Sequence, residues 1–114
     1  MNLKYIYKII NKDDLEKAKF SGTYSGSSKD IKDGYIHFSG QEQVKSIFKK
    51  HYSGEKNLIL LKVATLKLDH LVWEQSSDGN FFPHLYSPLE LINLVEEYEV
   101  NLDSEGNHKL PENF

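Results

Sequence analysis

Short apolar runs separated by turn-forming residues dominate the chain, a pattern typical of short β-strands. In residues 3–10 (LKYIYKII) the odd positions from Leu3 to Ile9 share one face of an extended segment. Residues 57–64 (NLILLKVA) form a continuous apolar run, which is typical of a central strand. Strands are predicted over residues 3–10, 35–39, 57–64, 71–75, 81–86 and 98–102, with a turn at 103–107 before a final strand in the tail.

Two short helices are predicted between these strands. Asp13 and Glu16 form a D-x-x-E capping box, which indicates a helix from Asp13 to about Lys19. Ser39 and Glu42 form a second box, S-x-x-E, ahead of residues 44–51. This second helix has one apolar stripe at helical spacing, made of Val44, Ile47, Phe48 and His51.

The remaining segments are predicted to be irregular or to lie at an edge. Residues 20–34 hold three glycines and four serines and are expected to form a long loop, functional or mobile. Pro83 favours an edge strand or a strand start for residues 81–86, because proline cannot donate a ladder hydrogen bond. A short helical turn is expected at residues 88–91. Several short strands with two short helices indicate an α+β fold on a curved antiparallel sheet.

Length and charge narrow the choice of function. A chain of 114 residues fits a single domain, residues 1–114. The net charge of −3 gives no basic footprint, so a nucleic-acid partner is not expected. All 14 cationic residues are lysines, so any anion must be held by lysine, histidine, hydroxyl or backbone N–H groups. The absence of cysteine excludes disulfides, thiolate metal sites and cysteine nucleophiles.

The chain shows no sequence signal for a membrane. Its start is too short and too charged for a signal peptide, and its longest apolar run falls well below the roughly 18 residues of a membrane span. We therefore expect a cytoplasmic protein without a membrane partner, either a monomer or a weak homodimer.

Three segments place polar groups inside apolar runs: residues 34–39 (GYIHFS), 71–74 (LVWE) and 82–86 (FPHLY). Burial of such groups is costly unless they are paired, so they pair with one another or serve a ligand. Each also has a structural reading: a hydrogen-bonded core histidine, a helix cap for Ser39, a solvated charge for Glu74, and an edge or rim residue for His84 and Tyr86.

The residues also allow two other kinds of site, a metal site and a phosphate-binding loop. His37, His84 and Glu74 could form a His₂Glu metal site, but they lie on separate strands without ligand spacing, and no metal is predicted. Residues 21–28 (SGTYSGSS) could cradle a phosphate through backbone N–H groups. No Gly-Lys-Ser/Thr sequence follows them, so a flexible connector is the favoured interpretation.

The combination of IYKI, GTYSGSSKDIKDGYIHFS, LVWE and FFPHLYSPL resembles the bacterial family catalogued as domain of unknown function 952, from about Tyr5 to about Tyr98. The resemblance implies an ADP-ribosyltransferase-like fold, a split antiparallel sheet around an NAD cleft. It implies that His37 holds ribose, that Tyr86 or Tyr35 stacks on nicotinamide, and that Glu74 stabilises an oxocarbenium-like transition state. Relatives often carry an arginine where this chain has Val72.

Three functional hypotheses follow from the residues and the resemblance. The first is a non-catalytic module that binds a small molecule, a nucleotide or NAD-like ligand. The second is an ADP-ribosyltransferase-like enzyme that acts on NAD or a sugar nucleotide, and the third is a structural or protein-partner role. The predicted catalytic residues are Glu74, His37 and Tyr86, and the predicted ligand-binding residues are Tyr35, His37, Ser39, Phe82, His84 and Tyr86.

Overall fold

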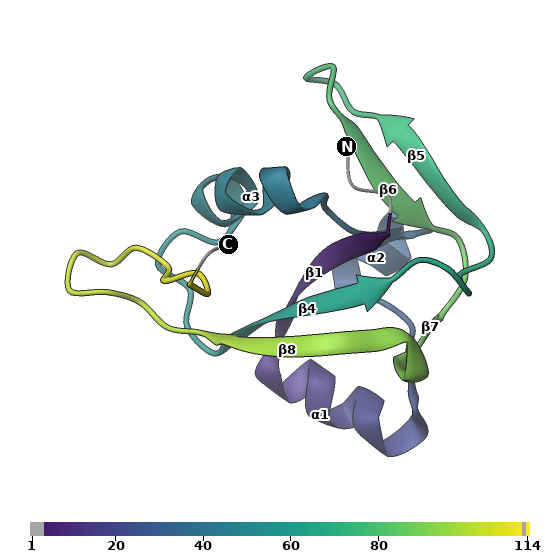
Figure 1. The fold of residues 1–114 in the computed structure, drawn as a ribbon, viewed down its shortest axis with the longest axis horizontal. Coiled ribbons are helices and arrows are strands. Elements are labelled where there is room, and N and C mark those ends of the chain that lie inside the picture. Colours follow the sequence, from purple (N-terminus) through teal and green to yellow (C-terminus); the bar gives the residue numbers. More distant parts are fainter. Residues whose placement is uncertain (1–3, 113) are drawn as a thin grey trace.

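The computed structural model describes residues 4–112 and 114. Its largest sheet contains β1 (Tyr5–Asn11), β4 (Leu58–Ala64) and β8 (Leu94–Val100), which pair antiparallel with β4 in the middle (Figure 1). The apolar run of β4 is buried on both faces, which confirms the prediction of a central strand at residues 57–64.

Helices cover both faces of this sheet, below and above it in Figure 1. On one face α1 (Lys12–Ser21) packs through Leu15 and Ala18. On the other face α3 (Val44–His51), which follows the 3₁₀ turn η1 (Gln41–Gln43), packs through its predicted apolar stripe. In that stripe Val44 and Phe48 are buried, and His51 is exposed.

A second antiparallel sheet carries the predicted polar segments. Its strands are β3 (Ile36–His37), β6 (Phe81–Leu85) and β5 (Leu71–Gln75), with β6 in the middle. One face of this sheet packs on the core that α1 also covers, through Ile36, Leu71, Trp73 and Leu85. We call the opposite face, which carries His37, Glu74 and His84, the outer face.

The segment that was predicted to be a long loop contains a strand and a helix. Residues 20–34 contain β2 (Thr23–Tyr24), which pairs with β7 (Leu89–Glu90), and α2 (Ser28–Asp33). The prediction of two short helices was therefore wrong, because α2 is a third. A capping box begins α2: Ser27 Oγ accepts from Asp30 N at 3.2 Å, and Asp30 Oδ2 accepts from Ser27 N at 2.9 Å.

The two predicted helix starts were also wrong by one or two residues. The cap of α1 is Asn11, whose Oδ1 accepts a hydrogen bond from Asp13 N at 2.9 Å. Gly40 precedes η1, and its N–H donates to Gln43 Oε1 at 2.8 Å. The side chain that accepts from the cap residue is therefore that of Gln43 and not the predicted Glu42. Ser39 instead exchanges two backbone hydrogen bonds with Tyr7.

Pro83 corrects the prediction of an edge strand, because it is fully buried in the central strand β6. Its carbonyl accepts a hydrogen bond from Phe38 N at 3.0 Å. Proline has no N–H to donate to β3 in return. The ladder between β3 and β6 ends just before Phe38, at the pair His37–His84. The shortness of β3 is therefore what makes room for a proline in the middle of this sheet.

The other predicted segments differ from the structure mainly at their ends. The strand predicted at 71–75 matches β5, whereas the one at 35–39 shortens to two residues and the one at 98–102 begins earlier, at Leu94. Leu3 lies outside the described residues. The helical turn expected at 88–91 occurs later, as η2 (Leu91–Asn93), and the described tail forms one isolated bridge, between Leu102 and His108. Among the described residues, no helix is long and apolar enough to cross a membrane.

Candidate functional site

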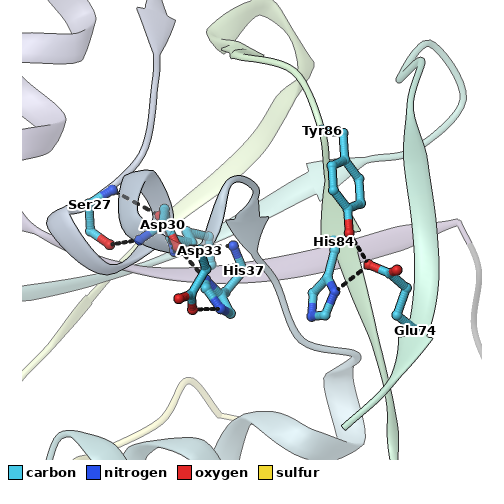
Figure 2. A network of polar contacts seen from close by, with 8 residues as sticks. Ser27, Asp30, Asp33, His37, Glu74, His84 and Tyr86 are labelled. Carbon is cyan, nitrogen blue, oxygen red and sulfur yellow. Dashed lines mark hydrogen bonds and ion pairs between the residues drawn. The ribbon is translucent and has the colours of Figure 1, made fainter.

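A buried acidic side chain, Asp30, organises one half of the site. Lys8 on β1 reaches it with Nζ at 3.2 Å from Oδ1 and 2.9 Å from Oδ2. His37 on β3 approaches Oδ1 with its backbone N at 3.1 Å and its ring Nδ1 at 2.6 Å. Together with the cap from Ser27, these contacts fix helix α2 against two strands (Figure 2).

The electrostatics of Asp30 favour its charged form. Burial alone would raise the pKa of this carboxyl, but the hydrogen bond from His37 and the charge and hydrogen bonds of Lys8 outweigh burial and hold it well below its usual range. Burial lowers the pKa of Lys8, and Asp30 offsets part of that effect. The pair is therefore a buried ion pair, with side chains only 6% and 2% exposed.

His37 has a carboxylate at each ring nitrogen. Its Nδ1 faces Asp30, and its Nε2 lies 3.0 Å from Asp33 Oδ2, four residues earlier in the chain. An ionised carboxylate only accepts hydrogen bonds, so both ring nitrogens must donate if both contacts are hydrogen bonds. His37 thus lies between two carboxylates on the outer face.

The second half of the site centres on Glu74 of β5. Its Oε1 accepts hydrogen bonds from Tyr86 OH at 2.5 Å and faces His84 Nδ1 at 2.8 Å (Figure 2). The hydrogen bonds from Tyr86 and His84 lower the pKa of Glu74. The same bond to Glu74 raises the pKa of Tyr86 to about 12, because loss of the phenol proton would place two negative charges together.

Tyr35 connects the two halves. Its ring stacks on His84 with a centroid distance of 4.0 Å and an interplanar angle of 27°. It also lies 4.7 Å from the ring of His37 and 5.2 Å from that of Tyr86. Burial raises the pKa of Tyr35, and the negative charges of Asp33, Glu74 and Asp30 add to the effect. The two histidine rings themselves are 5.5 Å apart, as expected for a directly opposed cross-strand pair.

A groove of about 260 Å³ opens beside this aromatic group. Its lining includes Tyr35 and Tyr86 together with Asp30, Ile31, Ser25 and Pro88. A neighbouring groove of about 330 Å³ shares Ser25 and Ile31 with it and is lined largely by the hydroxyl-bearing residues of 21–28. The two grooves therefore adjoin, the first with Tyr35 and Tyr86 in its lining and the second lined mainly by hydroxyl groups.

The structure brings together five of the seven residues predicted for the site: Tyr35, His37, Glu74, His84 and Tyr86. Ser39 forms an isolated backbone bridge with Tyr7 of β1, and no side-chain contact joins it to these five within the described residues. Phe82 is paired in register with Glu74, without a ring contact to the others in the described part of the chain. No group of three His, Asp or Glu side chains among the described residues is arranged to hold a metal ion.

Sequence reasoning missed Lys8, Asp30 and Asp33. Signals for the first two were present, because Lys8 interrupts the apolar run YIYKII, and Ser27 and Asp30 stand in an S-x-x-D spacing typical of a helix start. Asp33 had no comparable signal. Its contact with His37 depends on the left-handed turn at Gly34 (φ 87°), which redirects the chain after α2.

Comparison with known proteins places the chain in a family. Residues 9–97 match the family model described as "Protein of unknown function (DUF952)". The X-ray structure of protein CC0527 from Caulobacter crescentus is similar, with 39% sequence identity, a TM-score of 0.86, and coverage of 92% of this chain and 93% of that chain. The solution NMR structure of CC0527 is also similar, with 39% identity, a TM-score of 0.81 and 90% of each chain covered. No curated protein matches. The chain belongs to the DUF952 family, as its motifs predicted.

Proposed function

We propose that the outer face binds a small molecule that carries a flat ring, of the nucleotide or NAD-like class. The observation that carries this proposal is the convergence of Tyr35, His37, Glu74, His84 and Tyr86 beside an open groove. A concave site with aromatic walls and a few oriented polar groups is the common form of a small-molecule site.

The polar groups suit different parts of such a ligand. Both bonds to Glu74 end on Oε1, and no hydrogen bond from the described residues reaches Oε2, which is left for a hydroxyl donor such as a ribose. The adjoining groove offers the hydroxyls of Ser25 and Ser28 to the sugar or phosphate part of a longer ligand. In a chain without arginine, such hydroxyls would take the place of the bidentate grip that arginine gives an anion.

The NAD-like ligand class comes from the ADP-ribosyltransferase-like fold that the sequence resembles, which we retain as part of the proposal. An enzyme of that type is the second candidate. It is favoured by the ionised state of Glu74, whose lowered pKa keeps a negative charge on the outer face, where an oxocarbenium-like transition state could use it. In that case Glu74→Gln would abolish turnover of NAD without loss of the fold.

The binding proposal can be tested by amide chemical-shift perturbation. NAD, ADP-ribose and nicotinamide would be titrated separately into ¹⁵N-labelled protein, with a divalent metal as a parallel addition. We expect shifts concentrated at Tyr35, His37, Glu74, His84 and Tyr86 with NAD and at least one of its fragments. Tyr35→Leu should weaken binding, whereas Phe20→Leu, at a side chain on α1 that is 98% exposed, should leave it unchanged.

The outcomes of this titration separate the hypotheses. No perturbation by NAD or either fragment would overturn the proposed ligand class. Perturbation without any product on long incubation would favour a binding module. Release of nicotinamide that is lost in Glu74→Gln would favour the enzyme.

A further inference from the structure

The contact between Glu74 and His84 fixes the protonation of the histidine ring. Glu74 Oε1 lies 2.8 Å from Nδ1, and an ionised carboxylate can only accept a hydrogen bond. Nδ1 must therefore carry the proton. In the neutral ring this leaves the lone pair on the other nitrogen, Nε2.

The Nε2 atom of His84 is open. No described residue forms a hydrogen bond with it, and no buried side-chain nitrogen or oxygen among the described residues lacks a partner. Nε2 must therefore reach the molecular surface, although the His84 side chain is only 10% exposed. The ring is thus mostly enclosed, with its basic edge accessible.

The neighbours of His84 hold the ring in place. Tyr35 stacks on it at 4.0 Å, and Glu74, which orients Nδ1, is itself fixed by Tyr86 OH. All the groups lie on paired strands or directly beside them. Positioning on rigid elements is what a proton-transferring group requires.

His37 cannot play the same part. Both of its ring nitrogens face carboxylates, those of Asp30 and Asp33, so neither is open to a ligand. Its ring lies beside that of His84, with ring centroids 5.5 Å apart.

We propose that His84 is a general base, oriented by Glu74, that removes a proton from a hydroxyl group bound at the outer face, that of water or of a sugar. The O–H bond breaks, the proton forms an N–H bond at Nε2, and the electron pair stays on oxygen. That oxygen attacks an electrophilic carbon or phosphorus of the ligand. The leaving group departs with its bonding electrons and takes the proton back from Nε2.

In this arrangement Glu74 is a positioning residue that also stabilises the imidazolium formed at His84. The role differs from the one implied by the transferase resemblance, in which Glu74 faces the substrate directly. The inference goes beyond ligand binding and does not depend on the proposed ligand class.

The first test needs no ligand. Imidazole ¹⁵N–¹H correlation spectra of the wild-type protein should show the neutral form of His84 as the Nδ1–H tautomer. Glu74→Leu removes the acceptor on a half-exposed side chain and should move His84 towards the Nε2–H tautomer that free imidazoles favour. A wild-type Nε2–H tautomer would overturn the proposal.

The second test measures reactivity with an activated ester, p-nitrophenyl acetate. Since general-base catalysis contributes about 10²- to 10⁴-fold, we expect His84→Gln to lower the hydrolysis rate at least about tenfold. Glu74→Leu should lower it in parallel with the tautomer change. His51→Gln, at an exposed histidine on α3, should leave it unchanged. Equal rates for wild type and a folded His84→Gln would overturn the proposal, whether or not NAD binds.

Discussion

Lys8 occupies a strand position where the neighbouring residues of β1 are apolar and buried. A charge in such a place requires a partner, and Asp30 supplies it from a helix 22 positions away in the sequence. The Asp30 carboxylate also accepts hydrogen bonds from His37 and from the backbone of Ser27. One side chain therefore connects strand β1, the cap of α2 and the candidate site. The cost of burying Lys8 is therefore offset by its ion pair with Asp30, and the same carboxylate holds His37 in place.

Removal of one member of this pair should be strongly destabilising. We expect Lys8→Met to lower the free energy of unfolding by about 3–5 kcal/mol, because it leaves a buried carboxylate without its cation. The matched control is Lys12→Met, which removes a half-exposed pair with Glu99 and should cost less than about 1 kcal/mol. Urea denaturation measures both, and equal losses would contradict a special role for the buried pair.

The hydrogen bond from Tyr86 to Glu74 predicts a specific titration. The raised pKa of Tyr86 means that the bond favours the folded state below about pH 10, and that this contribution is lost as the pH rises through about 12. In Glu74→Gln, the pKa of Tyr86 should fall towards about 10.

The titration can be followed by ¹³Cζ tyrosine spectra. Tyr98 is an internal control, because its pKa is raised to about 12 by a different partner, Glu96, and should not respond to Glu74→Gln. A Tyr86 midpoint that stays near 12 in the variant would show that Glu74 is not the cause.

At the scale of elements, α2 is the part of the fold that sequence reasoning handled least well. Its six residues, four of which are lysine or aspartate, have no apolar face, and the helix is stabilised by its caps and by one buried carboxylate. Periodicity is the main sequence signal for helices, and here it was absent. Only the S-x-x-D spacing of Ser27 and Asp30 could have revealed it.

The strands were easier to predict, because buried strands show a recognisable hydrophobic pattern in the sequence. The apolar run of β4 and the bounds of β5 agree with the prediction, and Trp73 faces the core while Glu74 faces outward. The cross-strand pairing of His37 with His84 was not accessible, since register depends on which distant strands meet. The candidate residues could thus be named from the sequence, but their geometry could not.

The turn before α2 has little space for a side chain at Gly26. Gly26 has φ 115°, and a Cβ there would lie 2.7 Å from Asp30 Cβ. We expect Gly26→Ala to destabilise the protein more than Gly22→Ala, which has φ 80° and open space and should cost about 1–2 kcal/mol from backbone strain alone. Thermal unfolding of both variants makes the comparison, and a smaller loss at Gly26 would contradict it.

At the scale of the whole molecule, the two larger sheets share one apolar core. Ile6 and Leu61 from the first sheet, and Ile36 and Leu85 from the second, belong to the same buried cluster. A second cluster under α3 includes Leu60. Because β4 contributes to both clusters, the clusters are expected to unfold together.

This shared strand predicts cooperative unfolding. Leu85→Ala and Leu60→Ala should each lower the free energy of unfolding by about 2–5 kcal/mol. In each variant the fluorescence of Trp73, which reports on the second sheet, and far-UV circular dichroism should give the same midpoint. Separate midpoints would indicate that the two sheets unfold independently.

The strand order β1-β4-β8 has a consequence for how the protein acquires its structure. Tyr5 pairs with Ala64, Leu58 with Val100, and His37 with His84, so every ladder of the two larger sheets except the β5–β6 hairpin joins segments far apart in the chain. In folds dominated by such pairings, the chain loses the entropy of loop closure before the long-range contacts can stabilise it. Such folds therefore form slowly, in about milliseconds to seconds. A nascent chain therefore cannot close either sheet until most of its length has been synthesised, and the histidine pair forms only after β6 has found β3.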